Sequence, residues 1–261
     1  MSPRAHRLYL VLAGIFLVNL FLAEFIGVKI FTLDASLGME RHQWTLFGIT
    51  GGYDLTVGVL MWPVVFILTD VLHEYYGKRG VRFLSWLGVA LILYGFAMAL
   101  FAISLVPATW WPGSAVEQGV PDQQAAYAAI FGQGAWSIAG SVTAFLLAQL
   151  LDIYIFSALR RRYGSGRIWL RATGSTLVSQ FADTLLVLYI AFVLGPQQWG
   201  WDRLFAVGGF NYGYKFLVAL AMTPVLYLVH RGIRRYLGEA EARRMADNAV
   251  ATGGSLSQAD R

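Results

Sequence analysis

The chain of 261 residues is 57% hydrophobic and only 13% charged, whereas soluble domains are about half apolar and about a quarter charged. It contains no cysteine, which excludes disulfides, thiolate metal sites and a cysteine nucleophile. The net charge of +5 comes from arginines beside apolar runs, a pattern of membrane topology rather than of nucleic-acid binding.

Apolar runs long enough to cross a membrane recur along the chain, since a hydrocarbon core of about 30 Å needs about 20 residues of helix. The runs are continuous and rich in Leu, Ala, Val and Phe, unlike the alternating strands of a membrane barrel. We therefore predict an all-α integral membrane protein with six transmembrane helices. They are expected at residues 8–28, 55–75, 83–106, 135–159, 170–194 and 206–230.

The first run follows a basic start at Arg4 and Arg7, which superficially resembles a secretory signal. It is too long for a signal core and lacks a clear small-residue cleavage pattern, so we expect it to remain as the first span. Glu24 lies toward its outer end, where an ionisable group needs a partner, a water-filled cavity or a function.

The second run ends in a cluster of ionisable residues. Asp70, His73 and Glu74 share a helix face, where they could bind a metal or act as acid and base. Their position beside Lys78 and Arg79 instead favours a solvated ion-pair network at the cytoplasmic end. Both interpretations remain open at this point.

Two connections are longer than a helix hairpin needs, at residues 29–54 and 107–134. Both fall on the side that we predict to be external. Residues 127–134 are expected to form a half-helix or a cap over an external pocket.

The last three spans carry polar groups at helical spacing. The fourth carries Gln149 and Asp152, and Asp152 is expected to contact an arginine or the second span. The fifth and sixth place Asp183 near mid-span and Lys215 about a third of the way in, so an ion pair between them is a natural neutralisation. This pair either handles substrate or protons or is purely structural. Stripes of neighbouring polar residues accompany it: Thr176, Ser179 and Gln180 beside Asp183, and Asn211 beside Lys215.

Basic residues mark alternate connections, which by the positive-inside rule are cytoplasmic. We therefore expect a multi-pass protein of the cytoplasmic (inner) membrane with both termini in the cytoplasm. Residues 1–237 form the membrane domain, and residues 238–261 are expected to be a polar cytoplasmic tail made of a frayed helix end and disordered chain. The basic residues concerned are Lys78, Arg79, Arg82, Arg160, Arg161, Arg162, Arg167, Arg171, Arg231, Arg234 and Arg235.

Motifs of soluble enzymes are missing. The chain has no phosphate loop, HExxH, GxSxG or dinucleotide-binding glycine motif. We therefore predict no enzymatic activity, no catalytic residues, no cofactor and no resident metal.

The arrangement of motifs over residues 8–235 resembles the queuosine precursor transporter family, also called the vitamin uptake transporter family. The likeness depends on the order, spacing and topology of several pieces together. These pieces are Phe66 to Asp70, Tyr76 to Lys78, Gln149 to Asp152 with Phe156, Leu159 and Arg160, Ser175 and Thr176, Ser179 and Gln180, Asp183 and Thr184, Ile190 to Phe192, and Asn211 and Tyr212 with Lys215.

The resemblance implies import of 7-cyano-7-deazaguanine or 7-aminomethyl-7-deazaguanine across the cytoplasmic membrane for salvage into tRNA queuosine. It also implies a six-helix fold like the substrate-binding components of energy-coupling-factor transporters. Gln180, Asp183, Asn211 and Lys215 are the implied substrate contacts. Glu24 joins them because a buried carboxylate can accept hydrogen bonds from the N–H groups of a guanine-like edge. Phe181, Tyr212 and Tyr214 are candidates to cover the base.

Other functions stay open from the sequence. One is a membrane-embedded metal-dependent enzyme using Asp70, His73 and Glu74, another an importer of a different vitamin-like solute, and a third a structural subunit without a ligand. Expected partners are the deazapurine and membrane lipid but no nucleic acid. A separate energising module or a second copy of the chain is a further expectation.

Overall fold

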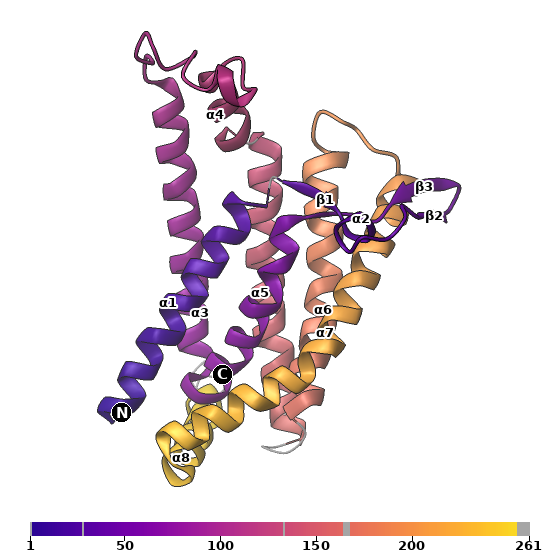
Figure 1. Cartoon of the computed structure of the whole chain (residues 1–261). Helices are drawn as coiled ribbons and strands as arrows, with labels where there is room; N and C mark the ends of the chain where they lie inside the picture. The colour runs from indigo at the N-terminus through magenta and orange to yellow at the C-terminus, as the bar shows by residue number, and fades with distance from the viewer. Residues whose placement is uncertain (1, 28, 133, 164–167, 255–261) are drawn as a thin grey trace.

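The computed structural model describes residues 2–27, 29–132, 134–163 and 168–254, and it is dominated by long helices (Figure 1). Among the predicted features, Val28, Arg167 and residues 255–261 lie outside this description. In chain order the elements are α1 (Pro3–Phe25), β1 (Ile30–Thr32), α2 (Leu33–Ser36), β2 (Gln43–Leu46), β3 (Ile49–Gly52), β4 (Asp54–Thr56), the 3-10 helix η1 (Val57–Leu60), α3 (Trp62–Ser104), the 3-10 helix η2 (Val116–Gln118), α4 (Gln123–Phe131), α5 (Ala135–Tyr163), α6 (Ile168–Leu188), the π-helix η3 (Tyr189–Val193), α7 (Trp201–Leu237) and α8 (Glu239–Gly254).

The helices have the length and apolarity of membrane spans, which confirms an all-α membrane protein. Within the described residues, five helical stretches meet both conditions. They are Pro3–Phe25, Trp62–Ser104, Gln123–Tyr163, Thr173–Val193 and Trp201–Leu237. The count of six is not confirmed, because the second and third predicted spans fall in the single run α3.

Gly77 divides α3 into two arms. Its φ of 74° and ψ of 175° are not helical, and the chain descends along the first arm and returns along the second (Figure 1). At 1.5 Å per residue the first arm, 62–76, is about 22 Å long, short of a hydrocarbon core of about 30 Å. The start of the predicted second span instead forms β4 and η1. Such non-helical backbone is tolerated at membrane depth where it is enclosed by protein or lines a cavity.

The connection at residues 29–54 contains strands that the sequence did not predict. β1 pairs with β4 and β2 pairs with β3, both antiparallel. Trp44 of β2 stacks on Phe210 of α7 with ring centroids 4.9 Å apart, and Tyr53 meets the same ring edge-on at 5.3 Å. The strands are thereby attached to the upper part of α7 (Figure 1).

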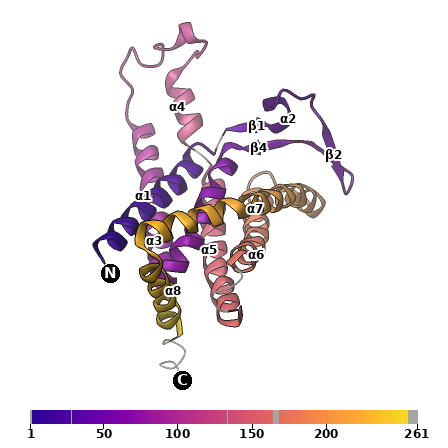
Figure 2. The same ribbon diagram turned by 60° about the horizontal axis from the view of Figure 1, so that its bottom comes forward.

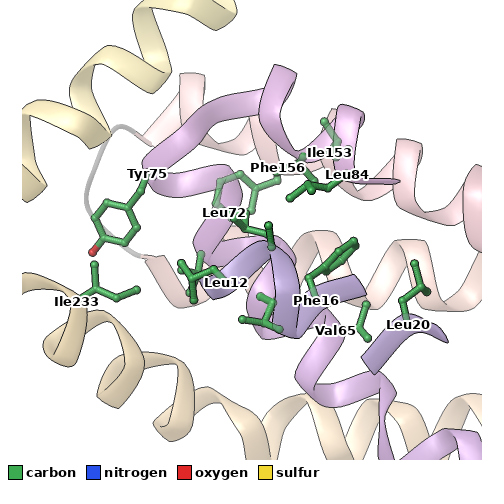
Figure 3. Packing of buried hydrophobic residues seen from close by; sticks show 14 of the residues in the cluster. Leu12, Phe16, Leu20, Val65, Leu72, Tyr75, Leu84, Ile153, Phe156 and Ile233 are labelled. Carbon is green, nitrogen blue, oxygen red and sulfur yellow. The ribbon is translucent and has the colours of Figure 1, made fainter. Parts of the chain in front are cut away.

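The core lies between α1, α3 and α5 and extends to Ile233 of α7 (Figure 3) and Met245 of α8. Phe16 and Leu20 of α1 and Val65 of α3 are fully buried, and Phe156 of α5 is 1% exposed. In lipid, helices associate through close packing rather than through escape from water. Gly88 permits that packing, because a Cβ there would lie 2.4 Å from the Leu20 side chain.

The segment after Gly238 is α8, so the expectation of a disordered tail is wrong for residues 239–254. Ala242 and Met245 are buried, and α8 packs mainly on α3. Figure 2 shows α8 beside α3 at the end of the molecule where α1 begins. Apolar residues at helical spacing, such as Ala242 and Met245 three residues apart, give α8 an apolar face that packs on α3. The low overall hydropathy of the segment hides this face in the sequence. The boundary at residue 237 remains a prediction.

Candidate functional site

A cavity of about 500 Å³ lies between α1, the strands, α5, α6 and α7; we refer to it as the central cavity. Four of the five predicted binding residues, Glu24, Asp183, Asn211 and Lys215, line it. The rest of its wall is formed by Ala23, Gly27, Ile30, Asp54, Leu55, Thr56, Gly58, Val59, Trp62, Ala129, Gly134, Ser137, Ser141, Thr184, Val187, Leu188, Ala191, Phe192 and Tyr214.

Glu24 is held in the wall by α5. It is 7% exposed, and the Ser141 hydroxyl lies 2.7 Å from both of its carboxylate oxygens, so that it can donate to either. Sequence reasoning missed Ser141. Ser137 also lines the cavity, and the spacing of four residues between the two serines was the available signal.

Asp183 and Lys215 form the predicted ion pair. Lys215 Nζ donates to Asp183 Oδ2 at 2.7 Å. The Lys215 side chain is 16% exposed and the Asp183 side chain 15%. Asn211 lies one helical turn from Lys215 on α7 and lines the same wall. Among the described wall residues, Lys215 is the basic one, facing the carboxylates of Glu24, Asp54 and Asp183. The cavity therefore favours ligands that donate hydrogen bonds.

Gln180, the fifth predicted binding residue, is not in the described wall of the central cavity. It lines a second, smaller space of about 40 Å³, here called the narrow pocket. The narrow pocket shares Val59, Trp62, Tyr214 and Lys215 with the central cavity, so the two spaces adjoin. The other described residues around the narrow pocket are Pro63, Phe66, Ile67, Asp70, Thr173, Thr176, Val218, Ala219, Met222, Thr223 and Leu226.

The remaining polar residues of α5 and α6 bind one another or α3. Ser179 donates to Asp152 at 3.3 Å, and Gln149 donates to Thr69 at 3.1 Å. Gln149 thus connects α5 to α3, a contact that the sequence predicted for Asp152 instead. Asp152 receives its hydrogen bond from α6, an arrangement that the sequence did not predict.

The cluster of Asp70, His73 and Glu74 is buried, so the predicted solvated network is wrong. The three residues are 6%, 3% and 4% exposed. Asp70 lines the narrow pocket, His73 Nε2 lies 3.0 Å from the Ser157 hydroxyl, and Glu74 pairs with Arg160 at 3.4 Å. Over the part of the chain that the structure describes, no three His, Asp or Glu residues are grouped to hold a metal ion.

Arg160 joins three elements at the end of the bundle where α8 lies. Its guanidinium donates to the backbone carbonyls of His73 and Glu74 on α3, at 3.2 to 3.3 Å. It also donates to the Ala246 carbonyl of α8 at 2.6 Å. Buried carbonyls without a hydrogen bond are costly. By pairing with carbonyls of both α3 and α8, Arg160 stabilises the packing of α8 against this end of the bundle.

Of the predicted aromatic residues, Tyr214 lines both spaces. Phe181 is 50% exposed and meets Tyr212 edge-on at 5.3 Å, and neither is in the described walls. Trp62 lines both spaces and was not predicted. Trp62 lies in the first turn of α3, just after the 3-10 helix η1, and its large flat side chain borders both spaces.

The connections at the other end of the molecule cover the central cavity. Leu55 and Thr56 of β4 are in its wall, and so are Ala129 of α4 and Gly134. The predicted half-helix at 127–134 is found as α4, somewhat earlier in the chain, at Gln123–Phe131.

Comparisons with known proteins agree with one another. A family described as "Putative vitamin uptake transporter" matches residues 56–229. The "Probable queuosine precursor transporter" of Bacillus subtilis (strain 168) is 34% identical over 210 residues, covering 80% of this chain and 84% of that protein. The "Queuosine precursor transporter" of Escherichia coli (strain K12) is 26% identical over 196 residues, covering 73% and 80%. No solved structure matches with significance.

Proposed function

The chain belongs to the vitamin uptake transporter family, and on that premise we propose that it imports the queuosine precursors 7-cyano-7-deazaguanine and 7-aminomethyl-7-deazaguanine. As a member it is a multi-pass membrane transporter of a small molecule and not an enzyme. The names of both relatives support this substrate class. The structural observation that carries the proposal is the meeting of Glu24, Asp183, Asn211 and Lys215 in one cavity.

The size of the central cavity supports a small-molecule substrate. Its volume of about 500 Å³ lies within the range of about 300 to 1,000 Å³ typical of ligand pockets. Trp62 and Tyr214 provide flat apolar surface in the wall, suited to covering the faces of a bicyclic base.

The polar groups support recognition of a guanine-like edge. Such an edge presents two N–H donors beside a carbonyl oxygen. We assign the donors to Glu24, whose carboxylate is oriented by Ser141 and keeps lone pairs for further bonds. Lys215, aligned by Asp183, and Asn211 are assigned to the carbonyl oxygen.

We further propose that the protein lies in the cytoplasmic membrane with both termini in the cytoplasm. The start of α1, α8 and the end of α5 lie at one end of the bundle, opposite α4 (Figure 1). Arg160, Arg161 and Arg162 are in the last turn of α5, and Arg234 and Arg235 end α7. Clustered basic residues at this end support a cytoplasmic position, which directs the central cavity outward. A separate energising module, a second copy and the likeness to energy-coupling-factor components remain predictions.

Uptake by cells that lack their own synthesis of these precursors tests the proposal. We would measure both labelled deazapurines with wild type, Glu24→Gln and Asp183→Asn, and use Asp202→Asn as the control because Asp202 is exposed outside the cavity. Uptake by wild type and the control, but strongly reduced in the cavity variants, is expected. Wild-type uptake no greater than that of the empty vector would sink the deazapurine assignment and favour another vitamin-like solute.

A further inference from the structure

The narrow pocket contains a buried acceptor without a hydrogen bond. Gln180 is 5% exposed, and within the described part of the chain its Oε1 has no hydrogen-bond partner. Leaving a buried carbonyl unsatisfied is costly, so this oxygen marks a place where another molecule can complete the bond.

The acceptor is within reach of a molecule bound in the central cavity. Gln180 and Asp183 are three residues apart on α6, about 4.5 Å along the helix axis, and they line the narrow pocket and the central cavity respectively. Lys215, Trp62 and Tyr214 belong to both walls. A ligand held by Asp183 and Lys215 can therefore extend a substituent toward Gln180.

The volume limits what can enter. The narrow pocket measures about 40 Å³, more than the roughly 10 to 15 Å³ that one water needs and well under the roughly 150 Å³ of a cavity that admits benzene. It is too small for a fused bicyclic ring. A side group of two or three heavy atoms fits.

The chemistry of the wall selects among such groups. A carbonyl oxygen needs a donor: an aminomethyl group, which is an ammonium at neutral pH, donates three hydrogen bonds, whereas a nitrile nitrogen only accepts. Asp70 adds a carboxylate to the same wall. Lys215 also borders it, but its positive charge is paired with Asp183 at 2.7 Å.

We propose that the narrow pocket is a specificity subsite for the 7-substituent of the deazapurine, and that Gln180 accepts a hydrogen bond from the aminomethyl group. The transporter then prefers 7-aminomethyl-7-deazaguanine to 7-cyano-7-deazaguanine. This inference rests on the proposed function, because it takes a deazapurine as the ligand of the central cavity.

The test compares the initial uptake of the two labelled compounds at several concentrations, normalised to the amount of protein in the membrane. Gln180→Leu removes the acceptor oxygen and keeps a side chain of similar size. Gln180→Glu keeps an acceptor, because an ionised carboxylate accepts hydrogen bonds but does not donate them. Gln149→Leu is the matched control, since Gln149 is 4% exposed, lies outside both described walls and bonds to Thr69.

We expect wild type to favour the aminomethyl compound, and Gln180→Leu to lower that preference about tenfold, as expected for a lost hydrogen bond to a charged group. Gln180→Glu is expected to retain or increase the preference, and Gln149→Leu to leave it unchanged. An unchanged preference in Gln180→Leu, or selective loss of aminomethyl uptake in Gln180→Glu, overturns the subsite while leaving the proposed function intact. If wild type takes up neither compound, the proposed function fails and the subsite fails with it.

Discussion

Trp44 and Phe210 lie with their rings stacked 4.9 Å apart and 15° from parallel, which joins the β2–β3 hairpin to α7 one residue before Asn211 of the central cavity. Aromatic pairs of this kind contribute about 0.5 to 1.5 kcal/mol beyond the area that they bury. The hairpin is therefore coupled to the wall of the site.

Replacing Trp44 by alanine is expected to free the hairpin. On the proposed orientation, limited proteolysis from the outer side of right-side-out vesicles should cut residues 43–52 several times faster in Trp44→Ala than in wild type. The KM of uptake should rise because Phe210, next to Asn211 of the cavity wall, loses its stacking partner. Phe47→Ala is the control, since Phe47 is 73% exposed at the hairpin tip. Equal cleavage of Trp44→Ala and wild type would show that the stacked pair does not hold the hairpin.

The Asp183–Lys215 pair predicts a non-additive double variant. Removing one partner leaves a charge in a mostly buried place and is expected to cost about 3 to 5 kcal/mol. Asp183→Asn and Lys215→Met should each lower the Tm in detergent, and the combined variant should be lowered by less than the two losses added together. Strictly additive losses in this cycle would mean that the 2.7 Å contact contributes no coupling.

Arg160→Lys is expected to release α8. A lysine cannot reproduce the planar set of donors that reaches the carbonyls of His73, Glu74 and Ala246. Hydrogen exchange of the amides at 239–249 should accelerate at least about tenfold, which corresponds to about 1.4 kcal/mol. Arg161→Lys, at an exposed neighbouring position, should leave exchange unchanged, and protection retained in Arg160→Lys would argue against the clamp.

The hydrogen bonds of Asp34 predict how the connection at residues 29–54 responds to acid. The backbone N–H of His42 donates to its carboxylate at 2.6 Å, and this bond, followed by that from Ala35, lowers the pKa of Asp34 below its usual value of 3.8. A lowered pKa means that the stabilisation is complete above 3.8 and is lost as the pH falls through the lower value of the folded protein. The His42 amide should therefore be protected from exchange, relative to an unstructured amide at the same pH, from pH 5 to 7, and should lose this protection only in stronger acid.

The matched variant for this effect is Asp34→Asn, which should exchange faster than wild type at neutral pH and converge with it in strong acid. A His42 amide in wild type that loses protection above pH 5 would contradict the assignment, because the ordinary carboxylate is still ionised there.

The sequence predicted those parts of the structure that lipid itself dictates. Long apolar runs have few alternatives in a membrane, and the cost of ionisable groups in lipid singled out Glu24, Asp183 and Lys215. Ser141 was missed because hydroxyls are frequent on membrane helices, and only the packing of α5 against α1 shows which one meets Glu24.

Other features depend on contacts between distant segments. Gly77 resembles any glycine in an apolar stretch until its φ of 74° is known. The stacking of Trp44 on Phe210 joins residues separated by most of the chain. Gln180 shares a stripe with Asp183 in sequence, yet the boundary between the two spaces passes between them, and nothing local marks that boundary.

The contact between Arg160 and α8 also has a consequence for biosynthesis. The Ala246 carbonyl that Arg160 reaches belongs to a helix that leaves the ribosome after every membrane helix described here. Until then, Arg160, which is only 5% exposed in the folded protein, has only some of its hydrogen-bond acceptors. Chains truncated before residue 239 are therefore expected to leave this end of the bundle more accessible to proteases than the chain that includes α8.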